Sequence, residues 1–272
     1  MRVTFWGTRG SLARSGPSTV RYGGDTAAVE VQADDGSTLF LDAGSGISRA
    51  KPPTNGRVDV LLTHLHMDHI QGLGFCKPLF DPALESHIWG PSSTTMALDE
   101  RLGRYLSPPL FPVRLRDLPR AKVHDLAPTT IEIGPFRIVV DLICHPGPTL
   151  GYRIEDEAGG SIAYLPDHEP ALGTRRFPIA PAWTSGHALA EGVDVLIHDA
   201  QYTDAEYQER VGWGHSAFAQ TVAFAQQAGV KTLVPFHHDP DHSDDFLDHM
   251  FEEAIVGPLQ MVAGRQDITI EV

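Results

Sequence analysis

The chain has very little cysteine. Among its 272 residues only Cys76 and Cys144 are cysteines, and they lie far apart in the sequence. A chain of this length can bury a core without disulfides, and two distant thiols cannot build a cysteine-rich zinc module. We therefore expect a reducing, cytoplasmic setting and no cysteine-ligated metal.

Long apolar runs are also missing. No stretch approaches the roughly 20 apolar residues that a membrane span needs, and residues 1–7 read as the start of a strand rather than as a signal peptide. The sequence shows neither an internal repeat nor a low-complexity tract. We expect no membrane association and one domain over residues 1–272.

Basic residues are scarce. Lysine and arginine number 21 against 35 aspartates and glutamates, which gives a formal net charge of -14. A surface of this sign repels polyanions. We therefore expect a small-molecule partner rather than a long nucleic acid.

Short runs of valine, isoleucine and leucine, bounded by glycine, proline or aspartate, recur along the chain and are typical of buried strands. Strands are predicted at 27–31, 38–41, 58–62, 136–143, 161–165, 193–197, 232–236 and 268–272. Helices are predicted at 93–105, capped by Ser92 or Ser93, at 217–228, ended by Gly229, and at 244–255. The proline-rich segments 107–112 and 177–181 are expected to form ordered surface loops or lids. Mixed elements from end to end predict an α/β fold.

Histidine is abundant, at 14 residues, and is densest directly after the predicted strand 58–62. That segment reads Thr63-His64-Leu65-His66-Met67-Asp68-His69. Side chains of a strand alternate between faces, so His64 and His66 point the same way, and the following turn can bring Asp68 and His69 to a neighbouring position. This density of ligand-type residues favours two adjacent metal positions over ordinary loop histidines.

The His-x-His-x-Asp-His run resembles the hallmark of the metallo-β-lactamase superfamily. The resemblance implies a four-layer αββα sandwich and further ligands, in a fixed order, after later strands. His145, Asp167 and His237 match that order, with His238 as a rival for the last position. One site would comprise His64, His66 and His145, a second Asp68, His69 and His237, and Asp167 would bridge the two.

Imidazole and carboxylate ligands suit two divalent ions, best zinc, although manganese or iron(II) remains compatible. His66 stands where the diiron, oxygen-reducing branch of the superfamily carries glutamate, so the resemblance favours hydrolysis. His168 and Glu169 follow Asp167 where a small hydroxyl residue is often found, so the surroundings of the metals are expected to differ here.

The segment Asp194 to Ala200, followed by Gly214-His215-Ser216, is similar to the phosphodiesterase branch, which includes ribonuclease Z and a cyclic phosphodiesterase. In that branch Asp199 would orient His215, and His215 would protonate the departing oxygen. An alkoxide leaving group needs such a proton, which a histidine can supply near neutral pH. The alternative is that Ser216 simply caps the next helix.

Three other residues have open roles. Arg9, in the glycine-rich segment Gly7 to Ser11, could contact a phosphate or be an ordinary surface arginine. Asp42 is expected to support the ligands by hydrogen bonding rather than to bind metal. His198 either supports the ligands or is simply buried.

These observations predict a metal-dependent hydrolase with Asp68, Asp199 and His215 as catalytic residues. The favoured substrate is a small phosphodiester, a cyclic nucleotide or cyclic phosphate, attacked by a hydroxide that bridges the metals. The alternatives are a hydrolase of carboxylic esters, lactones or thioesters, and a binding module without activity. The branch often dimerises, so a homodimer is a further expectation.

Overall fold

The computed structural model describes residues 1–51, 53, 56–172, 177, 179–252 and 257–272. Within them lie two seven-stranded sheets. The first sheet has the order β14 (Thr269–Glu271), β1 (Arg2–Gly7), β2 (Ala28–Gln32), β3 (Thr38–Leu41), β4 (Arg57–Leu61), β5 (Glu85–Pro91) and β6 (Ala121–Leu126). The second has the order β13 (Gln260–Met261), β12 (Thr232–Phe236), β11 (Val195–Asp199), β10 (Ser161–Leu165), β9 (Leu150–Asp156), β8 (Phe136–Leu142) and β7 (Thr129–Ile133).

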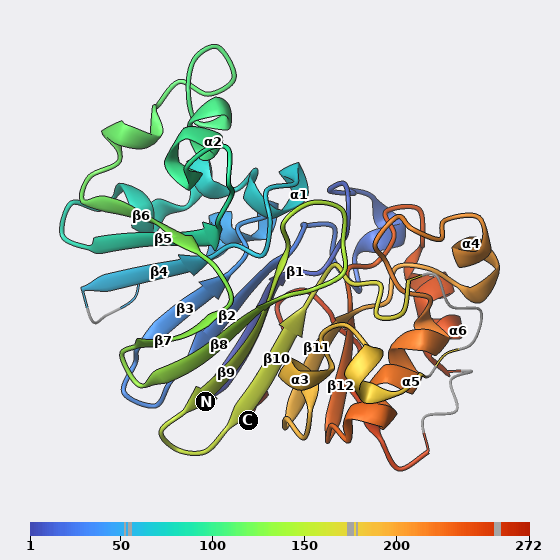
Figure 1. Ribbon diagram of the computed structural model, residues 1–272. Coiled ribbons are helices and arrows are strands. Elements are labelled where there is room, and N and C mark those ends of the chain that lie inside the picture. The colour runs from blue at the N-terminus through green and yellow to red at the C-terminus, as the bar shows by residue number, and fades with distance from the viewer. Residues whose placement is uncertain (52, 54–55, 173–176, 178, 253–256) are drawn as a thin grey trace.

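The two sheets face each other across an apolar core, and helices cover both outer faces (Figure 1). Between the sheets, the Phe236 ring lies 6.1 Å from that of Phe5 and 5.8 Å from that of Tyr164. The helices are α1 (Met67–Ile70), α2 (Leu98–Tyr105), α3 (His187–Ala190), α4 (Asp204–Gln208), α5 (Phe218–Ala228) and α6 (Asp244–Glu252). Helices α3, α5 and α6 lie against the second sheet, while α1, α2 and short 3-10 turns lie against the first. The predicted αββα sandwich is confirmed.

Every predicted strand is present, with ends within two residues of the prediction. The chain also forms β5, β6, β7, β9 and β13, which the sequence did not predict. Strand β6 shows why, because its sequence mixes Lys122, His124 and Asp125 with apolar residues. It is an edge strand and needs no continuous apolar run.

Helix α2 begins five residues later than predicted, and its predicted serine cap is wrong. Ala97 is the extended residue before the helix, and the carboxylate of Asp125 accepts from the Leu98 N–H at 3.2 Å. A partner from a distant strand therefore replaces the local cap. Helix α5 ends as predicted, with Gly229 in the left-handed conformation at φ 65°. The last residues of the helix predicted at 244–255, from 253 on, lie outside the described residues, as does residue 178 of the second proline-rich segment.

One edge of the sandwich collects the ends of many strands. Strands β3 and β4 run parallel in the first sheet, and β10, β11 and β12 run parallel in the second. Strand β8 shares the direction of β10, because each is antiparallel to β9. Turns that follow parallel strands gather at one edge, the usual place for a ligand site in such sheets. The Leu150 N–H donates to the Thr63 carbonyl across the two sheets at 2.9 Å.

Candidate metal centre

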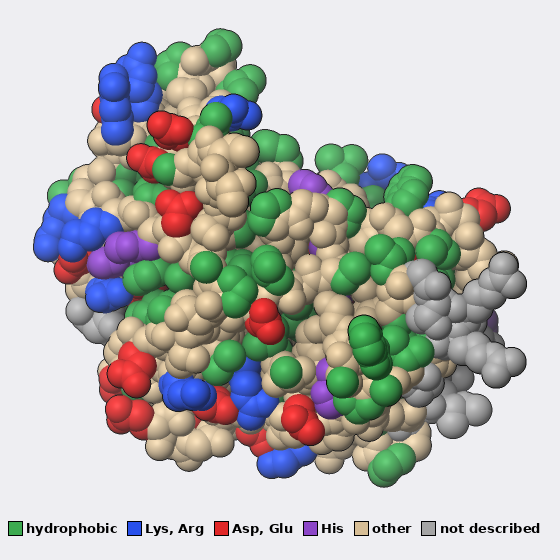
Figure 2. All heavy atoms as spheres, in the orientation of Figure 1, with side chains coloured by type: hydrophobic (Ala, Val, Ile, Leu, Met, Phe, Trp, Pro, Cys, Tyr) green, Lys and Arg blue, Asp and Glu red, His purple; other side chains and the backbone are tan. Residues whose placement is uncertain are grey.

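The histidine motif lies where β4 ends and the short helix α1 begins. His66 precedes α1, and Asp68 and His69 lie within its single turn. His64, Asp68 and His69 are buried, whereas His66 is exposed. Figure 2 shows histidine side chains reaching the surface beside α1.

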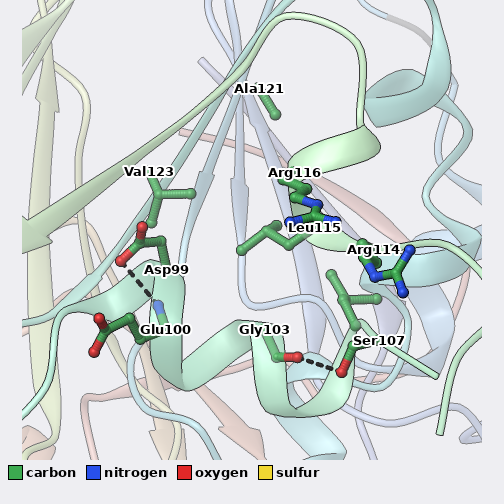
Figure 3. A pocket seen from close by; sticks show the side chains of 10 residues that line it. Asp99, Glu100, Gly103, Ser107, Arg114, Leu115, Arg116, Ala121 and Val123 are labelled. Carbon is green, nitrogen blue, oxygen red and sulfur yellow. Dashed lines mark hydrogen bonds between the residues drawn. The ribbon is translucent and has the colours of Figure 1, made fainter. Parts of the chain in front are cut away.

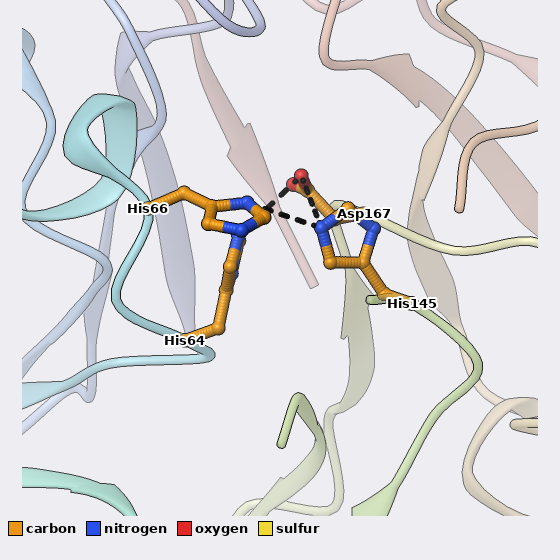
Figure 4. A group of neighbouring side chains, drawn as sticks. All are labelled: His64, His66, His145 and Asp167. Atoms are coloured by element: carbon orange, nitrogen blue, oxygen red, sulfur yellow. Dashed lines mark hydrogen bonds and ion pairs between the residues drawn. The ribbon is translucent and has the colours of Figure 1, made fainter. Parts of the chain in front are cut away.

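A first group of ligand-type side chains comprises His64, His66, His145 and Asp167. In Figure 4 the first two reach in from one ribbon segment and the other two from the opposite side. His145 Nε2 lies 3.2 Å from His66 Nδ1 and 3.7 Å from Asp167 Oδ2. His64 Nε2 also lies 3.7 Å from Asp167 Oδ2. All four offer one ligand atom within 4.8 Å of the others.

A second group comprises Asp68, His69, Asp167 and His237. His69 Nε2 lies 3.0 Å from Asp167 Oδ1 and 3.3 Å from Asp68 Oδ2. His237 Nε2 lies 3.2 Å from each of the same two oxygens. Asp167 belongs to both groups and turns one oxygen toward each, which is the arrangement expected of a carboxylate between two ions.

The donor atoms of these groups fit divalent cations. His64 Nε2 and Asp167 Oδ1 are buried and make no hydrogen bond, although buried polar atoms are rarely left unpaired. Burial lowers the pKa of His64, His66 and His145, so their imidazoles are neutral and can offer lone pairs. Burial would raise the pKa of Asp167, but His237 and His69 outweigh it and hold this carboxyl ionised. Nitrogen and oxygen donors of this kind suit zinc, manganese or iron(II).

Four of the imidazoles have their outer nitrogen fixed by a hydrogen bond. The Nδ1–H of His64 donates to Thr63 Oγ1 at 3.1 Å, that of His69 to Asp42 at 2.7 Å, that of His145 to the Gly214 carbonyl at 2.8 Å, and that of His237 to Gln201 Oε1 at 2.9 Å. Such bonds set the tautomer and leave the Nε2 lone pair for a cation.

Asp42 supports the centre and does not belong to either group, as expected. It is fully buried, accepts from the Thr63 N–H at 2.7 Å, and accepts from the Tyr164 hydroxyl at 3.0 Å as well as from His69. Its backbone is left-handed, at φ 57°. The sequence did not reveal Gln201, which lies in the turn after β11 and accepts a hydrogen bond from His237 as Asp42 does from His69.

The structure separates His237 from its rival. His238 is fully buried and donates from Nε2 to the Gly264 carbonyl at 2.7 Å, away from both groups. Burial lowers the pKa of His238 to about 3. The ring of His237 lies against Gly10, where a Cβ atom would be only 2.3 Å from its Nδ1. The glycine-rich segment after β1 (Arg2–Gly7) therefore makes room for the last histidine.

Neither expectation for Arg9 is met. It is fully buried, so it is not a surface arginine, and it points into the protein rather than toward a phosphate. Its guanidinium donates to the carbonyls of Gly23, Asp239 and His242 at 3.0, 2.8 and 2.8 Å, and lies 4.0 Å from Asp244. Arg9 thus joins the N-terminal segment to the turn after β12.

Asp199 and His215 meet beside the second group. His215 Nδ1 donates to Asp199 Oδ2 at 2.7 Å, and the His215 ring stacks on that of His237 at 5.0 Å. Burial lowers the pKa of His215, but Asp199 raises it more, to about 9. His198 is buried behind them, where its Nδ1 donates to the Asp199 carbonyl.

Comparison with known proteins identifies the family. A family model described as "Beta-lactamase superfamily domain" matches residues 37–238. This chain belongs to the metallo-β-lactamase superfamily. It is 26% identical to ribonuclease Z of Gemmatimonas aurantiaca over 281 residues, covering 84% of this chain and 85% of that protein.

Two solved structures share the fold. The metallo-β-lactamase fold protein YhfI from Bacillus subtilis has a TM-score of 0.70 and 19% identity, covering 99% of this chain and 98% of its own. A diphosphatase from the PhnP family has the same TM-score and identity, covering 99% of this chain and 97% of its own. The predicted resemblance to ribonuclease Z, and through it to the phosphodiesterase branch of the superfamily, is confirmed by the sequence match.

Exposed apolar side chains adjoin the site residues of this superfamily member. Met67 lies between His66 and Asp68, and 53% of it is exposed. Leu12 follows Ser11, whose N–H donates to Asp68, and Trp213 precedes Gly214; they are 58% and 59% exposed.

A separate cavity of about 560 Å³ lies between α2 and β6 (Figure 3). Its lining combines Asp99 and Glu100 with Arg114 and Arg116 over an apolar floor. It shares no residue with the metal groups, so we do not place the reaction there. Among the described residues, no helix is both long and apolar enough to cross a membrane.

Proposed function

We propose that this metal-dependent hydrolase is a phosphodiesterase that cleaves a small phosphodiester, with a cyclic nucleotide or related cyclic phosphate as the favoured substrate. The observation that carries the proposal is the Asp199–His215 pair beside the metal groups. The alkoxide released from a phosphodiester needs a proton, and this pair can supply one.

The site would hold two divalent ions, and zinc is the favoured metal. The residues that would bind them are His64, His66, Asp68, His69, His145, Asp167 and His237. When bound, such ions supply positive charge to phosphoryl oxygens and lower the pKa of water. The Ser11 N–H holds Asp68 in place at 2.7 Å. His215 carries the proton for the leaving oxygen on Nε2, because its Nδ1 is fixed by Asp199.

Charge and surface chemistry support a small substrate. The net charge of -14 disfavours a long polyanion, while cations in the site attract a small one. The exposed side chains of Leu12, Met67 and Trp213 suit a nucleobase, which stacks well on apolar and aromatic groups. The relative named ribonuclease Z and the diphosphatase with the same fold both have names that refer to the cleavage of phosphate linkages.

The test compares bis(p-nitrophenyl) phosphate, cyclic nucleotides and a panel of lactones on the zinc-loaded protein. We expect His64→Ala to lose zinc and activity together. We expect His215→Ala to retain zinc and to slow cyclic-nucleotide hydrolysis about 100-fold. An unchanged rate for His215→Ala would refute the proton donor. A higher kcat/KM on lactones than on any phosphodiester would refute the substrate class and favour the carboxylic ester alternative.

A further inference from the structure

Glu169 is a buried carboxylate that the proposed reaction does not use. It lies two residues after Asp167 and is 1% exposed. Its oxygens accept from the Tyr207 hydroxyl at 2.7 Å, from the Gly212 N–H at 3.0 Å and from the Gly214 N–H at 2.9 Å. Its negative charge is thus directed at the backbone of the loop that carries His215. Hydrogen bonds to an ionised acceptor are stronger than those between neutral groups.

Gly214 connects this carboxylate to the metal centre. Its N–H donates to Glu169, and its carbonyl accepts from Nδ1 of the ligand-type residue His145 at 2.8 Å. The backbone of Gly214 has φ 87°, and a Cβ there would lie 2.3 Å from Pro146 Cδ and 2.4 Å from His145 Nδ1. No larger residue fits, and the close approach of the loop to His145 depends on Gly214 being held in this conformation.

The neighbouring residue holds the other side of the same loop. The His168 carbonyl accepts from Ser216 Oγ at 2.6 Å, so consecutive residues bind the chain both before and after His215. The residue before them, Asp167, belongs to both metal groups. Three consecutive residues therefore fix the shared carboxylate and the loop of His215 relative to each other.

We propose that Glu169 is a positioning residue, which sets the place of His215 relative to the metal groups. The proposal rests on the function proposed above, in which His215 is the proton donor. Glu169 belongs to neither metal group, and its oxygens are occupied by the Tyr207 hydroxyl and loop amides, so it acts through the loop that carries His215 rather than by contact with a cation or a substrate. Glu169 is one of the two residues after Asp167 that depart from the usual family pattern, and the positioning role would explain its presence.

Two substitutions test the positioning role, one with a larger and one with a smaller expected loss of activity. Glu169→Gln keeps the size of the side chain but removes its negative charge, so the hydrogen bonds from the Gly212 and Gly214 N–H groups are made to a neutral acceptor and weaken. Tyr207→Phe removes one donor from the carboxylate and leaves its bonds to the loop intact. Glu209→Gln, an exposed residue just after α4, is the matched control.

The experiment measures kcat on two substrates of the zinc-loaded enzyme. Bis(p-nitrophenyl) phosphate releases a stable phenolate that needs no proton, whereas 3′,5′-cyclic AMP releases an alkoxide that does. We expect Glu169→Gln to lower kcat on cyclic AMP by about 10-fold or more, with less than about a threefold effect on the p-nitrophenyl ester. Tyr207→Phe should show the same selectivity with a smaller loss, and Glu209→Gln should match the wild type.

Two further comparisons decide the outcome. The double variant Glu169→Gln/His215→Ala should be no slower on cyclic AMP than His215→Ala alone, because Glu169 acts through His215. Equal slowing of Glu169→Gln on both substrates, or additive losses in the double variant, would overturn the positioning role. If His215→Ala itself does not distinguish the two substrates, the proposed proton donor fails; if it does and Glu169→Gln does not, only the positioning role fails. Should Glu169→Gln not fold, Tyr207→Phe alone must show the selective loss.

Discussion

Substitution of Asp42 by asparagine tests how the protein prepares His69 for a cation. Asparagine is chosen because it tolerates the left-handed backbone of Asp42, at φ 57°, which would strain alanine. One carboxylate oxygen accepts from the Thr63 N–H at 2.7 Å and the other from His69 Nδ1 at 2.7 Å. The amide of asparagine can replace only one of these oxygens as an acceptor.

Either orientation of the new amide costs a contact. If its NH₂ faces His69, the imidazole must move its proton to Nε2, the atom that lies 3.0 Å from Asp167 Oδ1 in the second metal group. If its NH₂ faces Thr63, two donors oppose each other. We expect zinc affinity at the second position to fall about 10- to 100-fold, which is about 1.4–2.8 kcal/mol. We expect an unfolding free energy lower by about 1–3 kcal/mol, from the contact left unsatisfied.

The assay is a zinc competition against chelators of graded affinity, with zinc per chain measured at each step. The control is Asp35→Asn, in an exposed turn where the carboxylate accepts from the nearby Ser37. We expect the Asp42 variant to release its first zinc to a weaker chelator than the control does, and to keep the second. Equal zinc affinities at both positions, in a folded variant, would refute the proposed role of Asp42.

Two further predictions concern stability. Arg9→Met should lower the free energy of unfolding by about 3–5 kcal/mol in urea, because three carbonyls, two of them buried, lose their donor, while KM stays unchanged. A raised KM without loss of stability would show substrate contact instead. Burial raises the pKa of Glu30, although Trp6, Arg2 and Lys51 oppose the effect. The folded state therefore holds the proton more tightly than the unfolded state, so the contribution of Glu30 to stability is present at acidic pH and is lost as pH rises through the folded pKa. Glu30→Gln, which can still accept from Trp6, should therefore be more stable than the wild type at pH 7 and equal to it near pH 4; the opposite order of melting temperatures would contradict this sign.

The sequence predicted the parts of the site that depend on local pattern. His64, His66, Asp68 and His69 follow a buried strand closely, and this density of ligand-type residues indicates one site, although β4 ends at Leu61 and strand alternation does not extend to them. The later residues His145, Asp167 and His237 were predicted from the resemblance, because they match the superfamily's order of ligands, and the structure brings them to the same edge. Whether each binds a metal stays a prediction.

What the sequence could not predict depends on partners far away along the chain. Arg9 binds carbonyls more than 200 residues later, and nothing near it in sequence indicates that it is buried. Helix α2 begins where Asp125, from another strand, satisfies its first N–H. Gln201 and Glu169 are ordinary polar residues until the fold places them against His237 and Gly214.

The metal centre draws on both sheets at once. His64 to His69 come from the turn after β4 of the first sheet, whereas His145, Asp167 and His237 follow β8, β10 and β12 of the second. A cation held by both sets is a cross-link between the two halves of the sandwich, at the edge where the substrate must enter. Its binding energy therefore adds to the free energy that keeps the sheets docked. The metal concentration would then determine the stability of the folded protein as well as its activity.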